Sequence, residues 1–200
     1  MPTAKEKVIQ AAISILNREG ADNLTMRTLA HELNRTAASL YNHIRNKQEL
    51  FGEIAEYMCM DFVIPKKTLS PLDFMTEAHR AYRTMLQTVR DSPVVFENSL
   101  PITPGRVALI RTISEAYIAF GVPRELLMMV SNMVNNYVLS FVADEYRFKS
   151  RSAEEVKAFI TEMNIDAPAI VLSPIDFDTQ FDYGLQILFA WIESIIVIHE

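Results

Sequence analysis

The sequence predicts an all-α protein with a small N-terminal domain and a larger helical body. Apolar residues recur at helical spacing along almost the whole chain, and no run of five residues alternates as a half-buried strand does. Residues that start and stop helices divide this pattern into segments. The chain has 200 residues, 50% of them hydrophobic and 22% charged, which suffices for a substantial core and argues against disorder.

Three short helices are predicted in residues 1–46. The first ends at Gly20, because glycine readily adopts the left-handed conformation that closes a helix. Thr25 caps the second, since its side-chain oxygen can accept a hydrogen bond from the first turn. Asn34, which also tolerates the left-handed conformation, ends it. A very short third helix covers residues 36–43.

A fourth helix is predicted to connect this domain to the body. Asn46 caps it, and Glu49 stands three residues later, as in a capping box. The helical pattern continues to Pro65, where the missing N–H of proline interrupts it. The predicted boundaries are therefore 1–46 for the N-terminal domain, 47–64 for the connecting helix and 65–200 for the body.

The body is predicted to be a series of further helices. Ser70, Pro71 and Asp73 are typical of a helix start. A segment interrupted by prolines follows. The later helices are expected at residues 104–120, 124–148, from Ser152 onward, and 179–199. Segment 164–178, with two prolines and little helical pattern, is the loop that we expect to be most mobile.

The charge is unevenly distributed along the chain, whose formal net charge is −6. Residues 1–50 hold seven Lys/Arg against five Asp/Glu, a net charge of +2, and residues 51–200 hold twelve against twenty, a net charge of −8. A mildly basic head on an acidic body suggests that the head binds nucleic acid.

Several classes of protein are excluded. The single cysteine, Cys59, cannot form an internal disulfide or a zinc cluster. There is no transmembrane run and no signal peptide, so we expect a cytoplasmic protein. A Gly-rich phosphate loop, a Cys/His pair at ligand spacing and a Gly-x-Ser-x-Gly motif are all missing, so we expect no catalytic site, metal or cofactor.

The segment LTMRTLAHELNRTAASLYNHIRNKQELF, residues 24–51, has the organisation of a helix-turn-helix motif. Leu29, Leu33 and Leu40 can hold its two helices together, which leaves polar side chains for the major groove. The predicted DNA-contacting residues are Arg35, Thr36, Ser39, Asn42 and His43 as hydrogen-bonding groups, Ala37 and Ala38 as methyl contacts to thymine, Arg27 to a base or phosphate, and Thr25, Tyr41 and Lys47 to phosphates.

A structural interpretation remains open for several of these residues. Arg27 can also be a surface charge. Tyr41 can also belong to the core, and His43 can also be a surface residue with its hydrogen bonds satisfied. Ala37 and Ala38 can simply be good helix formers.

Residues 24–30, 39–43 and 46–50 resemble the TetR family of bacterial regulators. They match its second helix, the Leu/Ile-Tyr-x-His end of its recognition helix and the Lys-x-x-Leu start of its fourth helix. The long final helix makes the tetracycline-repressor subgroup the most similar. The resemblance implies a homodimer with one DNA-binding head per subunit, a ligand cavity in the body, and release from palindromic operator DNA when ligand binds.

Two departures from the family pattern matter. Asn34 stands where the recognition turn usually has glycine, and asparagine also permits that turn. Phe96, with Glu97 beside it, stands where tetracycline repressors have the histidine that binds their magnesium–drug chelate, and Asp144 falls near their second metal ligand. The other polar drug-contact positions fall on apolar or small residues: Phe62, Ala78 and Ile113. The sequence therefore argues against tetracycline as the ligand.

The many methionine and aromatic residues of the body predict a permissive, apolar cavity, and we expect the effector to be a small, largely apolar molecule. The predicted ligand-binding residues are Met58, Phe62, Tyr82, Phe96, Ile113, Met128 and Asn132. Asn132, Asn135 and Asn136 can be hydrogen-bonding groups of the pocket, but positions in a dimer interface or in solvent are together favoured. We interpret His79 as a surface histidine, and Asp144 and Glu145 as an acidic face at a helix end.

Two long helices, at about 123–147 and 179–199, carry apolar residues on more than one face. One subunit could not bury them all, so these helices are predicted to form a four-helix homodimer interface. The alternative to a DNA-binding regulator is a helical adaptor that binds ligand or protein and has lost specific DNA recognition. Nothing in the sequence favours an enzyme.

Overall fold

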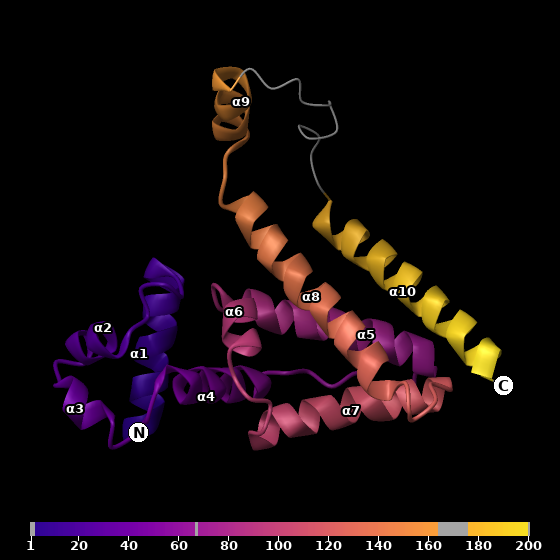
Figure 1. The fold of residues 1–200 in the computed structure, drawn as a ribbon, viewed down its shortest axis with the longest axis horizontal. Helices are drawn as coiled ribbons and strands as arrows, with labels where there is room; N and C mark the ends of the chain where they lie inside the picture. The colour runs from indigo at the N-terminus through magenta and orange to yellow at the C-terminus, as the bar shows by residue number, and fades with distance from the viewer. Residues whose placement is uncertain (1–2, 67, 164–175, 200) are drawn as a thin grey trace.

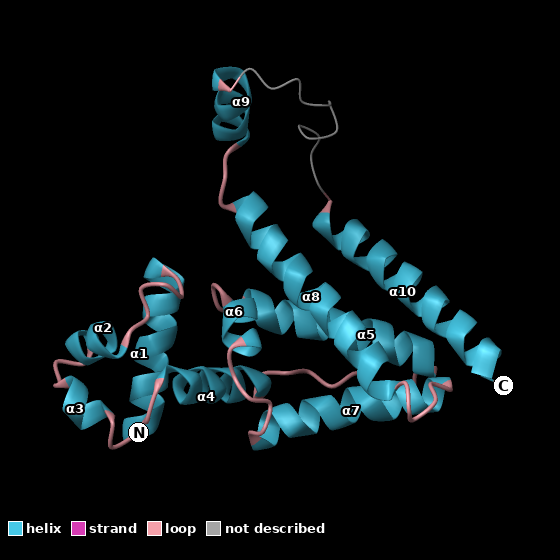
Figure 2. Cartoon of the chain, in the orientation of Figure 1, coloured by secondary structure: helices cyan, strands magenta, loops and turns pink. Residues whose placement is uncertain are grey.

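The computed structural model describes residues 3–66, 68–163 and 176–199. These residues form helices joined by loops and contain no strand, so the predicted all-α class is confirmed (Figure 2). In chain order the helices are α1 (Ala4–Glu19), α2 (Met26–Glu32), α3 (Ala37–Leu40), α4 (Lys47–Cys59), α5 (Pro71–Gln87), α6 (Ser92–Glu97), α7 (Pro104–Phe120), α8 (Leu127–Lys149), α9 (Ala153–Glu162) and α10 (Phe177–His199). Among them, no helix has the length and apolar character that crossing a membrane requires.

Helices α1 to α3 form the head, at one end of the molecule (Figure 1). Its core is built from fully buried apolar side chains: Ile15, Leu16, Leu24, Leu29, Leu40, Ile44 and Leu50. The two predicted caps are confirmed: Thr25 Oγ accepts from the Thr28 N–H at 3.1 Å, and Asn46 Oδ1 accepts from the Glu49 N–H at 2.8 Å. Asn34 has a left-handed φ of 52°, as predicted for the end of α2.

The connecting helix α4 ends at Cys59 and is therefore shorter than the predicted helix 47–64. Val63 and Ile64 are β-branched, and a residue that precedes proline, as Ile64 precedes Pro65, is disfavoured in the helical conformation. The chain therefore leaves α4 through a turn and an extended stretch. This prediction counted Pro65 as the only stop signal and was wrong by five residues.

The structure also adds a helix that the sequence analysis missed. α6 lies in the segment that we expected to be broken by prolines, and Pro93 stands in its first turn, where no N–H donor is needed. Three predicted boundaries were wrong by two or more residues: α3 covers Ala37–Leu40 instead of 36–43, α8 begins at Leu127 instead of 124, and α10 begins at Phe177 instead of 179. Of the predicted loop 164–178, residues 164–175 lie outside the described residues.

Helices α5, α6, α7, α8 and α10 form the body, and α4 joins it to the head (Figure 1). α5 packs against α7 and α8, and α4 packs against α6 and α7. α8 and α10 lie side by side and run in opposite directions, on the side of the body away from α3. The body thus has an inner layer that touches the connecting helix and an outer pair of long helices.

A buried ion pair ties α5 to the outer helices. The Arg83 guanidinium donates to both carboxylate oxygens of Glu145 on α8, at 3.0 and 2.9 Å, and to Asp178 on α10 at 2.8 Å. Burial disfavours the charged form of Glu145, but hydrogen bonds from Arg83, Lys149 and Gln87 outweigh it and lower the pKa of the carboxyl. The interpretation of Glu145 as an exposed acidic residue was therefore wrong, since its side chain is 3% exposed.

The head also contacts the body away from α4, at the end of α1. The Ala21 N–H donates to Asp91 Oδ2 at 2.8 Å, and the Arg90 N–H donates to Asn17 Oδ1 at 2.8 Å. Gly20, with φ of 86°, makes this approach possible, because a Cβ at this position would lie 2.9 Å from Asp91 Oδ2. The turn between α5 and α6 is thereby fixed to the head.

Candidate functional site

The candidate DNA-binding surface is the outer side of α2 and α3. None of the eleven predicted residues is buried: Thr25, Arg27, Arg35, Thr36, Ala38, Tyr41, Asn42 and Lys47 are exposed, and Ala37, Ser39 and His43 are partly exposed. Leu40 and Ile44 point inward and are fully buried, so they anchor the short α3 to the head. The exposed polar groups therefore stand on a well-packed support.

Three of these side chains also position the helices that carry them. The Thr36 hydroxyl accepts from the Ser39 N–H at 3.3 Å, and the Ser39 hydroxyl donates to the Thr36 carbonyl at 2.7 Å. The Lys47 amine donates to the Ala21 carbonyl at 3.0 Å and lies 5.2 Å from the centre of the Phe51 ring. Thr36 and Lys47 are exposed and Ser39 is partly exposed, so the same groups can hold the local structure and face a ligand.

Two arginines on this surface carry unpaired charge. Arg18 and Arg45 of the head pair with Glu32 and Glu49. Arg27 and Arg35, in contrast, make no ion pair with any carboxylate in the described part of the chain. Unpaired exposed guanidinium groups are suited to phosphate oxygens or to the acceptor edge of guanine.

The body contains a cavity of about 200 Å³ between α5, α6, α7 and α8. It is lined by His79, Tyr82, Phe96, Pro101, Arg106, Leu109, Ile110, Ile113, Ser114, Ser131, Asn132 and Asn135. Of the seven predicted ligand-binding residues, this lining includes Tyr82, Phe96, Ile113 and Asn132. A wider hollow of about 600 Å³, near Asn17 and between α5, α6 and α8, includes none of them.

The other three predicted residues lie elsewhere. Met58 lies on α4, is 2% exposed and packs in the core, and Phe62 is partly buried against the same core. Met128 is 77% exposed on α8 and does not belong to the lining of the cavity. The composition of the body predicted an apolar pocket, but it could not tell core methionines from surface ones.

His79 is buried in the cavity wall, so its interpretation as a surface histidine was wrong. Its Nδ1 donates to the Met75 carbonyl at 2.7 Å, which leaves Nε2 to accept from the Tyr117 hydroxyl at 3.2 Å. Burial lowers the pKa of His79 to about 4, so the ring is neutral at pH 7. Beside it, the Tyr82 hydroxyl donates to Asn135 Oδ1 at 3.2 Å.

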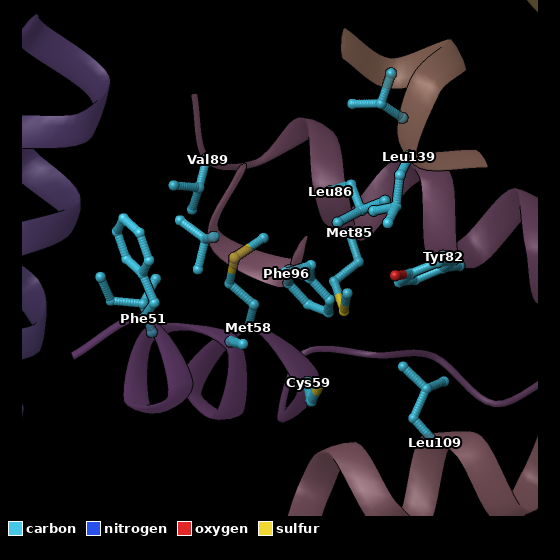
Figure 3. Close-up of a cluster of buried hydrophobic side chains, with 14 of the residues drawn as sticks. Phe51, Met58, Cys59, Tyr82, Met85, Leu86, Val89, Phe96, Leu109 and Leu139 are labelled. Carbon is cyan, nitrogen blue, oxygen red and sulfur yellow. The ribbon is translucent and has the colours of Figure 1, made fainter. Parts of the chain in front are cut away.

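Residues beside the cavity also pack against the connecting helix α4. Phe96 packs edge-on against Tyr82, with ring centres 5.9 Å apart, and in Figure 3 it lies between Tyr82 of α5 and Met58 of α4. At the start of α7, the Glu56 carboxylate of α4 accepts hydrogen bonds from the Gly105 N–H. α6 and α7 thus both lie between the cavity and α4.

The described residues contain no group of three His, Cys, Asp or Glu side chains that could hold a metal ion. Phe96 supplies an aromatic ring where the tetracycline-repressor pattern has a metal-binding histidine. The groups that line the cavity are apolar side chains, aromatic rings, amide and hydroxyl groups, and the Arg106 guanidinium.

The chain is similar to known bacterial regulators in sequence. Residues 8–54 match the bacterial regulatory proteins of the tetR family. The chain is 27% identical to the class A tetracycline repressor protein from transposon 1721 of Escherichia coli, over 90% of this chain and 86% of that protein.

Solved structures share the fold over nearly the whole length. ActR of Streptomyces coelicolor, in complex with actinorhodin, has a TM-score of 0.78 and 22% identity over 97% of this chain and 98% of its own. BioQ of Mycobacterium smegmatis has a TM-score of 0.73 and 27% identity over 96% and 99% of the two chains. A structure of BioQ with its double-stranded DNA operator has a TM-score of 0.72 and 28% identity over 96% and 98%. The TetR-family match of residues 8–54, the relatives that are similar over most of their length and the shared all-helical architecture together support a TetR-family transcriptional regulator.

Proposed function

We propose that this protein is a cytoplasmic repressor that binds palindromic operator DNA as a homodimer and releases it when a small molecule enters the body cavity. The observation that carries this proposal is the exposed polar surface of α2 and α3 on a packed head. Its unpaired guanidinium groups, Arg27 and Arg35, suit a polyanion. The relatives support the same role, since BioQ has been solved with its DNA operator and ActR with actinorhodin.

The outer helices support the homodimer. Met128 and Met133 on α8, and Tyr183, Ile187 and Val197 on α10, are between 41% and 77% exposed. Exposed apolar side chains on two adjacent long helices favour a four-helix interface with a second copy. Such a dimer would present two copies of α3, as a palindrome with half-sites about one DNA turn apart requires.

Release of DNA requires the effector to bind the released conformation better than the DNA-bound one, because affinity alone shifts no equilibrium. The contacts of Phe96 and Gly105 with α4 offer a route for this coupling. A ligand that displaces α6 or the start of α7 would move α4, and with it the spacing of the two heads.

A mobility-shift titration of the full-length protein against the DNA upstream of its own gene tests the proposal. We expect specific binding, and a loss in Arg27→Ala and in Tyr41→Phe of about 1–3 kcal/mol each, roughly 5- to 150-fold in affinity. Arg111→Ala, which removes an exposed arginine from α7 in the body, is the control and should bind as the unmodified protein does. Absence of specific binding, or equal binding by all four proteins, would contradict the DNA-binding role.

The second candidate is an adaptor that keeps the fold but acts through a protein partner. The modest basicity of the head and the two alanines on α3 favour it. The salt dependence of DNA binding distinguishes the two functions. A protein with several phosphate contacts loses DNA affinity steeply as salt rises: the logarithm of its binding constant falls with the logarithm of the salt concentration by about 0.9 per contact. An adaptor would bind DNA feebly at every salt concentration.

A further inference from the structure

Arg106 is the one charged side chain among the residues that line the body cavity. The other titratable groups of the lining are His79 and Tyr82. Burial lowers the pKa of His79 and raises that of Tyr82, so both are neutral at pH 7. No carboxylate belongs to the lining. The cavity therefore offers one positive charge and no negative charge to balance it.

The protein contacts of Arg106 leave this charge unpaired. Its Nη1 donates to the Ser99 hydroxyl at 2.6 Å and to the Phe96 carbonyl at 3.5 Å, which are both neutral acceptors. Its guanidinium carbon lies 4.6 Å from the centre of the Phe96 ring, so the group is held over the cavity's aromatic wall. Nε and Nη2 have no acceptor among the described residues, and guanidinium groups donate up to five hydrogen bonds.

The nearest candidate for a counter-ion is already occupied. Glu56 accepts hydrogen bonds from the backbone N–H groups of Gly105 and Arg106, and it forms no ion pair with the Arg106 side chain. Burial lowers the pKa of the Arg106 guanidinium, because partly apolar surroundings disfavour its charge. Arg106 is partly buried, and a partly buried cation is stabilised when an anion pairs with it.

The rest of the lining suits the remainder of an organic acid. Phe96, Leu109 and Ile113 supply apolar surface, and the buried Ser131 hydroxyl has no hydrogen-bond partner. A volume of about 200 Å³ exceeds the roughly 150 Å³ of a cavity that holds benzene, so one or two rings can fit.

We infer that the effector is a compact aromatic carboxylic acid, whose carboxylate pairs with Arg106 and whose ring system fills the apolar part of the cavity. This inference rests on the proposed function only in taking the cavity as the effector site. Arginine is suited to the task because its planar fork can donate two parallel hydrogen bonds to one carboxylate. Arg106 directly follows Gly105, whose N–H donates to Glu56 of α4. The pair of Arg106 with the carboxylate would therefore form where the cavity meets the connecting helix.

The test compares two probes that share ring and shape but differ in charge: naphthalene-2-carboxylate and naphthalene-2-carboxamide, with benzoate and benzamide as the smaller pair. Affinity is measured by calorimetry, and the shift in melting temperature is measured alongside it, with the full-length protein at pH 7. We expect at least one acid to bind ten or more times as tightly as its amide. Arg106→Gln should abolish this preference, and Arg106→Lys should keep part of it.

Arg111→Gln on the same helix is the matched control and should keep the full preference. Circular dichroism of each variant without probe checks that the fold is retained. Equal responses to acid and amide, including none to either, overturn the inference, and so does an acid preference that persists in Arg106→Gln.

The mobility-shift experiment separates this inference from the proposed function. If an uncharged molecule releases operator DNA and acids have no advantage, the inference fails and the regulator function stands. If the acid preference depends on Arg106 but no DNA is bound specifically, the inference stands and the regulator function fails.

Discussion

Glu56 on α4 and Gly105 in the first turn of α7 are joined by a carboxylate cap. Both oxygens of Glu56 accept from the Gly105 N–H, at 2.9 and 2.8 Å. Thr103, at the N-cap position of α7, makes no capping bond with its own hydroxyl. The helix that lines the cavity is therefore capped by the helix that leads to the head, and the free N–H groups at its start are satisfied from outside.

Removing this cap should destabilise the protein. Glu56→Ala is expected to lower the free energy of unfolding by about 1–2 kcal/mol, as the loss of an N-cap does. Gly105→Ala should do the same through a clash, because its Cβ would lie 2.8 Å from Glu56 Oε2. Urea unfolding measures both effects.

The two substitutions break the same contact. The loss in free energy of unfolding in the double variant should therefore be clearly smaller than the sum of the losses in the two single variants. Glu115→Ala, which truncates an exposed glutamate on α7, is the control and should change stability by less than about 0.5 kcal/mol. Strict additivity of Glu56→Ala and Gly105→Ala would show that the cap does not join the two helices energetically.

A comparison of this cap with the caps of the head shows which contacts can be predicted from the sequence. Thr25 and Asn46 cap helices through residues three positions away, so the local pattern predicted them. The Glu56–Gly105 cap joins residues 49 positions apart, and no local pattern carries that information. For the same reason the sequence predicted an apolar pocket and four of its lining residues, but not Arg106, whose partners only the packed fold supplies.

Gly20 should not tolerate a side chain. Its φ of 86° is unfavourable for other residues, and a Cβ would meet the Asp91 carboxylate at 2.9 Å. We expect Gly20→Ala to lower the free energy of unfolding by about 1–3 kcal/mol. Gly52→Ala is the control, because it lies within α4 and an added Cβ there meets nothing within 4 Å. That substitution should be neutral or stabilising by about 0.5–1 kcal/mol, and an equal loss in both variants would contradict the argument.

His79 makes stability depend on pH in a predictable direction. Its pKa of about 4 in the folded protein is below the usual 6.5, so the unfolded chain takes up the proton first as the pH falls. The stability that depends on the neutral ring is fully present above pH 6.5, and it is lost as the pH falls towards 4. Between pH 7 and pH 4.5 this loss is about 2–3 kcal/mol.

The measurement compares urea unfolding of the unmodified protein with that of His79→Gln at both pH values. Glutamine cannot titrate. Between pH 7 and pH 4.5 the free energy of unfolding of the variant should therefore fall by about 2–3 kcal/mol less than that of the unmodified protein. Every carboxylate is common to the two proteins, so the difference isolates the histidine. Parallel losses in both would mean that His79 is protonated as readily in the folded protein as in the unfolded chain.

The outer face of α10 should control dimerisation and, through it, DNA binding. Ile187 is 71% exposed on that helix, so an aspartate there costs the single subunit little but would be buried and unpaired in a four-helix interface. We expect Ile187→Asp to be a folded monomer by analytical ultracentrifugation, with operator affinity reduced at least tenfold because each head then binds alone. Val63→Asp, a residue 73% exposed between α4 and α5, is the matched control and should remain dimeric. A dimeric Ile187→Asp would place the interface on another face, and a monomeric variant with full operator affinity would remove the link between the dimer and DNA recognition.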